Sequence, residues 1–106
     1  MHRYFKNLYE DVGEDKKLVI ELKNDFLNIY NETITPLKKA IESDNYKKMD
    51  HLAHKLKGSC LNFNIPKLTK YFEKIENEGK NNINKDSKNL LDKIEVEINK
   101  FENIDI

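Results

Sequence analysis

The chain has 106 residues, with 19 basic and 19 acidic side chains and a formal net charge of zero. Hydrophobic residues make up 38% of it and charged residues 36%, which is typical of one globular domain spanning 1–106 and excludes a disordered chain. No apolar run approaches the roughly 18 residues that a spanning helix needs, and the start shows no signal peptide. We therefore expect a cytoplasmic protein that does not enter a membrane.

The basic residues are almost all lysines, and Arg3 is the exception. A surface that reads nucleic-acid bases favours arginine, so we expect no nucleic-acid partner. Residues 47–70 hold six lysines and one acidic residue, a net charge of +5, between two flanks that are acidic. This block predicts steering toward an acidic partner, although an uneven scatter of lysines would look the same.

The first predicted element is a short helix within residues 1–13, which carries apolar residues at helical spacing and ends at Gly13. A long second helix follows and ends near Ser43, with an apolar sector wide enough to pack against two neighbours. Pro36 lies inside it and predicts a kink, or a split near Thr35. The rows of that sector contain Val19, Leu22, Phe26, Ile29, Thr33, Pro36 and Ala40, with Ile20, Leu27, Ile34 and Ile41 beside them.

Three further helices are predicted downstream. Asp44 is a suitable N-cap for the third, which ends near Phe63, and Pro66 suits the first turn of the fourth, which ends at Gly79. Asn84 or Asp86 would cap the last one. The inner stripe of the third helix is Tyr46, Met49, Ala53, Leu56, Cys60 and Phe63; that of the fourth is Leu68, Tyr71, Phe72 and Ile75; that of the last is Ser87, Leu90, Leu91, Ile94, Ile98 and Phe101.

With no strand pattern present, these elements predict an all-α fold. We expect an antiparallel four-helix bundle over residues 15–101 with a short extra N-terminal helix over residues 1–13. The single cysteine, Cys60, cannot form an internal disulfide, and its place on an apolar stripe predicts a buried thiol in a reducing compartment.

His54 is the candidate functional residue. At 100° per residue it points roughly 130° away from the middle of the apolar stripe, which places it on the solvent side. Gly58 lies one turn later on the same strip, although glycine weakens a helix interior, and its missing side chain would let another molecule approach the imidazole. Lys57 lies one turn from the ring and can reach a charge carried on it. This combination suggests a histidine that accepts an anionic group from a bulky partner.

Residues 53–64 read Ala-His-Lys-Leu-Lys-Gly-Ser-Cys-Leu-Asn-Phe-Asn, which resembles the signature of histidine-containing phosphotransfer domains. The resemblance covers roughly residues 15–80, since Asp44-Asn45-Tyr46, Leu68 and the pair Ile75-Glu76 also fit the family pattern. Asn64 departs from it, because the family usually has glycine there. Asparagine is the next best residue for a left-handed helix end, so we expect the turn to be kept.

The resemblance implies a phosphocarrier in a two-component phosphorelay that passes a phosphoryl group between receiver-domain aspartates. His54 would be the acceptor, Lys57 would stabilise the phosphoryl charge, and Gly58, Leu61 and Lys55 would contribute to docking. The chain itself would be neither an enzyme nor a holder of a cofactor, because the partner receiver supplies the active site and its Mg²⁺. Its partners would be the receiver domains of a hybrid sensor kinase, a response regulator or both, and we expect a monomer.

Other interpretations remain open from the residues alone. A lone histidine on a helix face is usually only solvated, and a related bundle could dock a receiver or a kinase without being phosphorylated. His51 and His54 could share a metal ion, but no third ligand is patterned nearby, so no metal site is predicted. No acidic residue close to His54 in the sequence is placed to act as a base. The acidic residues of the long and last helices make a membrane-surface helix a poor interpretation.

Overall fold

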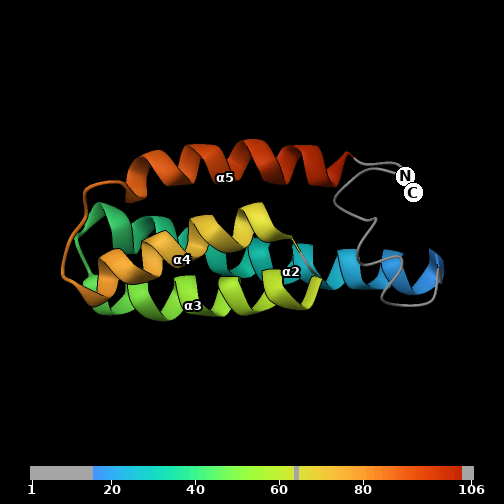
Figure 1. The fold of residues 1–106 in the computed structure, drawn as a ribbon, viewed down its shortest axis with the longest axis horizontal. Coiled ribbons are helices and arrows are strands. Elements are labelled where there is room, and N and C mark those ends of the chain that lie inside the picture. The colour runs from blue at the N-terminus through green and yellow to red at the C-terminus, as the bar shows by residue number, and fades with distance from the viewer. Residues whose placement is uncertain (1–15, 64, 104–106) are drawn as a thin grey trace.

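The computed structural model describes residues 16–63 and 65–103, which form four α-helices joined by short loops. They are α2 (Lys16–Glu42), α3 (Tyr46–Phe63), α4 (Pro66–Lys80) and α5 (Ser87–Glu102). No strand occurs in either described range. Figure 1 shows an up-and-down bundle in which α3 and α4 lie side by side. The predicted all-α four-helix fold is confirmed, whereas the helix expected over residues 1–13 lies outside the described residues.

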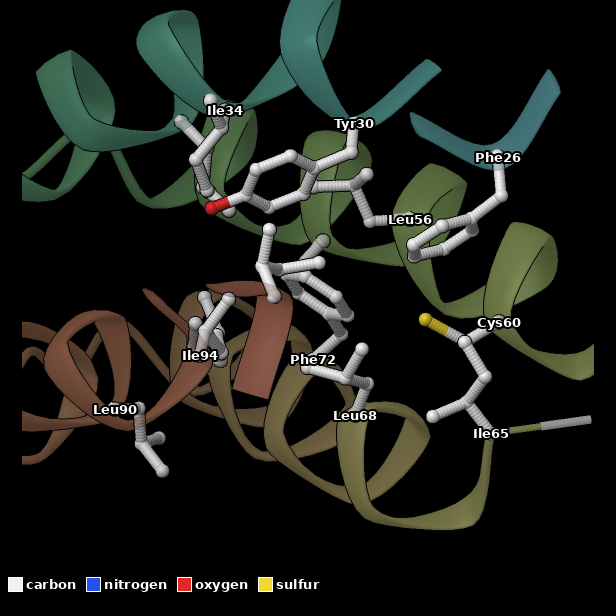
Figure 2. Close-up of a cluster of buried hydrophobic side chains, with 14 of the residues drawn as sticks. Phe26, Tyr30, Ile34, Leu56, Cys60, Ile65, Leu68, Phe72, Leu90 and Ile94 are labelled. Atoms are coloured by element: carbon white, nitrogen blue, oxygen red, sulfur yellow. The ribbon is translucent and has the colours of Figure 1, made fainter. Parts of the chain in front are cut away.

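The core is a single cluster to which every described helix contributes. Figure 2 shows side chains of all four helices meeting in one interior. At one end of it the rings of Phe26, Phe63 and Phe101 stack at centroid distances of 5.0 to 5.9 Å, two of the three pairs edge to face. Aromatic pairs in this geometry stabilise a core beyond the area they bury. The trio therefore joins α2, α3 and α5.

The apolar stripes predicted for α3, α4 and α5 are buried almost as expected, while that of α2 is partly wrong. Tyr30 and Leu37 lie in the core although neither belongs to the predicted rows, and Ile20 and Pro36 of those rows are exposed. The helix also runs unbroken through Pro36, so the expected split near Thr35 does not occur. The proline ring lies on the exposed side of the helix, and the kink expected there stays a prediction.

The predicted N-cap of α3 is wrong by one residue. The side chain of Asn45 accepts the hydrogen bond from the backbone N–H of Lys48 at 3.3 Å, as an N-cap does. Asp44 instead has a φ of 53° and turns the chain between α2 and α3. Its carboxylate accepts a 2.6 Å hydrogen bond from Asn84, which also donates to the carbonyl of Ile41. Asn84 thus fastens the α4–α5 loop to the α2–α3 turn rather than capping α5.

The N-terminus of α5 is capped from α4. Asp86 is the N-cap residue, but its side chain makes no capping hydrogen bond. The carboxylate of Glu78 accepts the backbone N–H groups of Lys85, Asp86 and Ser87 and the Ser87 hydroxyl, at 2.6 to 3.2 Å. A negative charge at a helix N-terminus is favourable, so this single side chain holds α5 against α4.

Candidate functional site

His54 is displayed on the outer surface of α3, as predicted. The stripe of α3 faces the core, and Ala53 and Leu56 on either side of the histidine in sequence are fully buried. The helix geometry therefore turns the imidazole outward, and its side chain is 69% exposed. Nδ1 points toward α4, which leaves the other ring nitrogen, Nε2, as the one available to a partner.

The residue that His54 meets on α4 is Glu76. Its Oε2 lies 2.5 Å from Nδ1 of His54, and its Oε1 accepts a 2.6 Å hydrogen bond from Nζ of Lys57. Lys80, one turn later on α4, brings its Nζ to 3.7 Å from Oε2. The side chain of Glu76 is only 2% exposed, so its carboxylate is a buried charge that these three groups surround. A buried charge is tolerated when it is paired and hydrogen-bonded in this way.

The environment keeps Glu76 ionised. Burial alone would raise the pKa of its carboxyl group, but the hydrogen bonds from Lys57 and His54 and the charges of Lys57 and Lys80 outweigh burial and lower the pKa. The reciprocal effect falls on Lys57, whose pKa is raised chiefly by the same hydrogen bond. Glu76 is thus a fixed negative charge behind the imidazole, and Lys57 is a fixed positive charge beside it.

This arrangement determines which nitrogen of His54 is nucleophilic. An ionised carboxylate can only accept hydrogen bonds, so Nδ1 must carry the proton that it donates to Glu76. In a neutral ring the free lone pair then belongs to Nε2, which faces outward. Any positive charge that forms on the ring when Nε2 binds an electrophile is compensated by Glu76 at once.

The other predicted site residues lie on the outer side of α3. A Cβ atom added to Gly58 would meet nothing within 4 Å, so the surface there is open. Leu61 is 61% exposed, the largest exposed fraction among the exposed large hydrophobic residues in the described ranges, and is available for contact. Lys55 is also exposed. The structure therefore places Lys57 in direct contact with the His54–Glu76 pair and leaves Lys55, Gly58 and Leu61 as surface around it.

Two residues of the site were missed from the sequence. Glu76 lies 22 positions from His54, too far along the chain for the spacing within one helix to relate the two residues. The signal for Glu76 in the sequence is the pair Ile75-Glu76, which fits the family pattern. Lys80 follows Glu76 by four positions, a spacing that places two side chains on one helix face.

The described ranges contain no cluster of metal-binding side chains. No group of three or more His, Cys, Asp and Glu side chains there could hold an ion. Nor is any helix of residues 16–63 and 65–103 long and apolar enough to cross a bilayer.

A helical bundle that exposes a histidine backed by a buried carboxylate is an arrangement suited to a group carrier. The family model of the Hpt domain matches residues 21–103, and the chain therefore belongs to the Hpt domain family. It is 32% identical over 79 residues to multistep phosphorelay regulator 1 of Schizosaccharomyces pombe, an alignment that covers 74% of this chain and 27% of that relative. No solved structure matches the chain. Family and relative together support a phosphotransfer role in a phosphorelay.

Proposed function

We propose that this chain is the phosphocarrier of a two-component phosphorelay and that Nε2 of His54 is the atom that carries the phosphoryl group. The observation that supports this most directly is the 2.5 Å contact between Nδ1 of the exposed His54 and the buried carboxylate of Glu76. A histidine that is only solvated does not need an ionised carboxylate buried behind its ring, and burying that charge is costly even when it is paired.

The proposed step is an in-line displacement at phosphorus. The Nε2 lone pair forms the N–P bond while the bond from phosphorus to the aspartate oxygen of the donor breaks, and the aspartate leaves as a carboxylate. The proton on Nδ1 stays in place, and Glu76 balances the positive charge that the ring acquires. Transfer onward is the same step reversed, with the aspartate of a second receiver as the nucleophile.

The residues of this chain supply position and charge, and the partner supplies the rest of the reaction centre. Nζ of Lys57 is held beside the imidazole by Glu76, from where it can turn toward the phosphoryl oxygens. Lys80 contributes a second positive charge at the same edge. The receiver aspartate and its Mg²⁺ belong to the partner, so the chain carries the group without being an enzyme. A cytoplasmic location, a monomeric state and a single domain over residues 1–106 remain predictions.

The surface around His54 has the properties that docking of a receiver requires. Gly58 leaves the space above the helix open, and Leu61, seven residues after His54, adds an exposed apolar side chain on the same side. Lys47, Lys55 and Lys57 of α3 give this face positive charge, whereas Lys67 of the same block pairs with Glu97 of α5. An acidic receiver surface would be attracted to it before contact.

The test is phosphoryl acceptance from a panel of phosphorylated receiver domains with Mg²⁺ present, comparing the native chain with His54→Gln. We expect an acid-labile, alkali-stable phosphate on the native chain and none on the variant, which should remain folded because the residue is exposed. His51→Gln, an exposed histidine one turn earlier, is the matched control and should be labelled normally. Labelled His54→Gln would refute the assignment, and binding without label from any receiver would favour a docking module.

A further inference from the structure

Gly79 occupies an unusual position for a glycine. It is buried in the last turn of α4, which ends at Lys80, one residue beyond the end predicted from the sequence. Glycine inside a helix is unfavourable relative to alanine, and no positive φ at this residue accounts for its presence. The reason lies across the interface: an added Cβ would lie 2.6 Å from the backbone nitrogen of Asp50 and 2.7 Å from the carbonyl oxygen of Tyr46.

The atoms that Gly79 faces cannot move aside. Residues 46 and 50 are four apart, and an α-helix joins the carbonyl of one to the N–H of the other by its own hydrogen bond. The backbone of α4 therefore rests directly on a backbone hydrogen bond in the first turn of α3. Gly58 provides the contrast, since nothing lies within 4 Å of a Cβ added there.

This contact is next to the His54–Glu76 pair. Asp50 precedes His54 by four residues and Gly79 follows Glu76 by three, and the two helices run in opposite directions. The glycine contact is therefore one helical turn from the site on both helices, about 5 Å along the interface. A wider separation of α3 and α4 at Gly79 would therefore also separate the backbones of Glu76 and His54.

We propose that Gly79 is a positioning residue whose missing side chain brings α4 close enough to α3 for Glu76 to contact His54 and Lys57. Ordinary contact of a Cβ begins near 3.4 Å, so an alanine at 79 would push the helices apart by about 0.8 Å. The two contacts of Glu76, now 2.5 and 2.6 Å, would lengthen to values at which a hydrogen bond is weak. The inference rests on the proposed role of His54.

The test uses two readouts on the whole chain with Gly79→Ala. The first is the ¹⁵N NMR spectrum of the His54 ring, assigned by comparison with His54→Gln, which reports the share of rings protonated at Nδ1. The second is the rate of labelling by phosphoramidate, whose P–N bond breaks as the N–P bond to Nε2 forms and ammonia leaves. This donor needs no docking surface. We expect a lower Nδ1–H share and labelling slowed by roughly tenfold.

Ile94→Val in the core of α5 is the control for general destabilisation, and spectra are compared where both variants are folded. If Gly79→Ala is poorly folded, trimethylamine oxide is added to restore the compact state. Glu76→Asp shortens the side chain and withdraws the carboxylate from His54 without changing the contact between the helices. It should therefore give the same lower Nδ1–H share as Gly79→Ala. Combining the two substitutions should lower that share little further.

The proposal is overturned if Gly79→Ala loses stability but keeps the native tautomer and labelling rate, or if Ile94→Val changes the tautomer equally. A native chain that phosphoramidate cannot label would count against the proposed function instead. In that case the role of Gly79 would still be decided by comparing the Nδ1–H share of the His54 ring in Gly79→Ala and in the native chain.

Discussion

His54 and Glu76 come from different helices and meet across the interface of α3 and α4 with Nδ1 and Oε2 2.5 Å apart. Because the carboxylate is buried and the imidazole is exposed, the pair has one side fixed by the core and one side open to a partner. The fold itself therefore orients the histidine, and the carboxylate that orients it lies in the protein interior. Such preorganisation lowers the reorganisation needed during reaction.

Glu76→Gln should slow phosphoryl acceptance at His54 by on the order of tenfold, because the ring loses the charge that stabilises its Nδ1 proton and its developing positive charge. Lys57 also loses its ionic partner, so its raised pKa should fall toward the ordinary value. Labelling by phosphoramidate measures the first effect without partner docking. The exposed Glu73→Gln on the same helix serves as control, and equal rates for Glu76→Gln and the native chain would remove Glu76 from the mechanism.

Substitutions at Gly58 should separate the stability of α3 from its function. Gly58→Ala fits the open space and should stabilise the helix by up to about 1 kcal/mol. Gly58→Phe should leave the fold intact but slow transfer from a receiver, because the ring occupies the approach to His54. Urea unfolding gives the first result and stopped-flow transfer the second.

Lys93→Phe adds the same bulk to an exposed position on α5 and is the control for Gly58→Phe. If transfer from the receiver is equally fast in both phenylalanine variants, clearance above His54 is not the role of Gly58.

Because of Glu78, the free energy of unfolding of the bundle should fall as the pH becomes acidic. Burial raises the pKa of its carboxyl group, but hydrogen bonds from Ser87 and from the backbone of Lys85, Asp86 and Ser87 outweigh burial and lower it. A lowered folded-state pKa stabilises the fold fully above the unfolded value of about 4.3, and this stabilisation is lost as pH falls through the folded-state pKa. Glu78→Gln should lower the free energy of unfolding near neutral pH by about 1 kcal/mol.

Circular dichroism during urea unfolding at several pH values between neutral and acid measures this effect. The difference between the native chain and Glu78→Gln should shrink as the pH falls below about 4. Glu32→Gln, an exposed acid on α2, is the control. A difference that stays constant with pH would mean that the Glu78 charge does not hold α5.

The lysines of residues 47–70 should make transfer from a receiver depend on ionic strength. Added salt screens exposed charges, so the bimolecular rate should fall as salt rises, while phosphoramidate labelling changes little. Lys55→Gln should reduce the slope, because it removes one charge near His54. A rate that is flat with salt would leave this block of lysines without a steering role.

The helices could be predicted from the sequence because the spacing of apolar residues along a helix determines which of them are buried. Met49, Ala53, Leu56, Cys60 and Phe63 recur every three or four positions, and all five are buried. The same periodicity placed His54 outside. Periodicity also governs α2, where Phe26, Tyr30, Ile34, Leu37 and Ile41 are buried at spacings of three and four. The predicted rows were wrong in omitting Tyr30 and Leu37, which belong to this stripe.

Only those site residues that share one helix could be related to each other from the sequence. His54, Lys57 and Gly58 share α3, so helical geometry relates them. Glu76 comes from α4, and the distance between two helices is not encoded in the periodicity of either one. The end of α4 at Lys80 is within one residue of the predicted end at Gly79. The close contact of Gly79 with α3 could not be predicted, because a glycine at an interface is recognised only when the opposing backbone is known.

Cys60 gives the bundle a natural probe of its own motions. It is the only thiol in the chain, none of its surface is exposed, and burial raises its pKa, so a thiol reagent can reach it only when the helices come apart. The labelling rate therefore measures how often the interior opens. Measured with His54 phosphorylated, it would show whether the carried group loosens or tightens the protein that carries it.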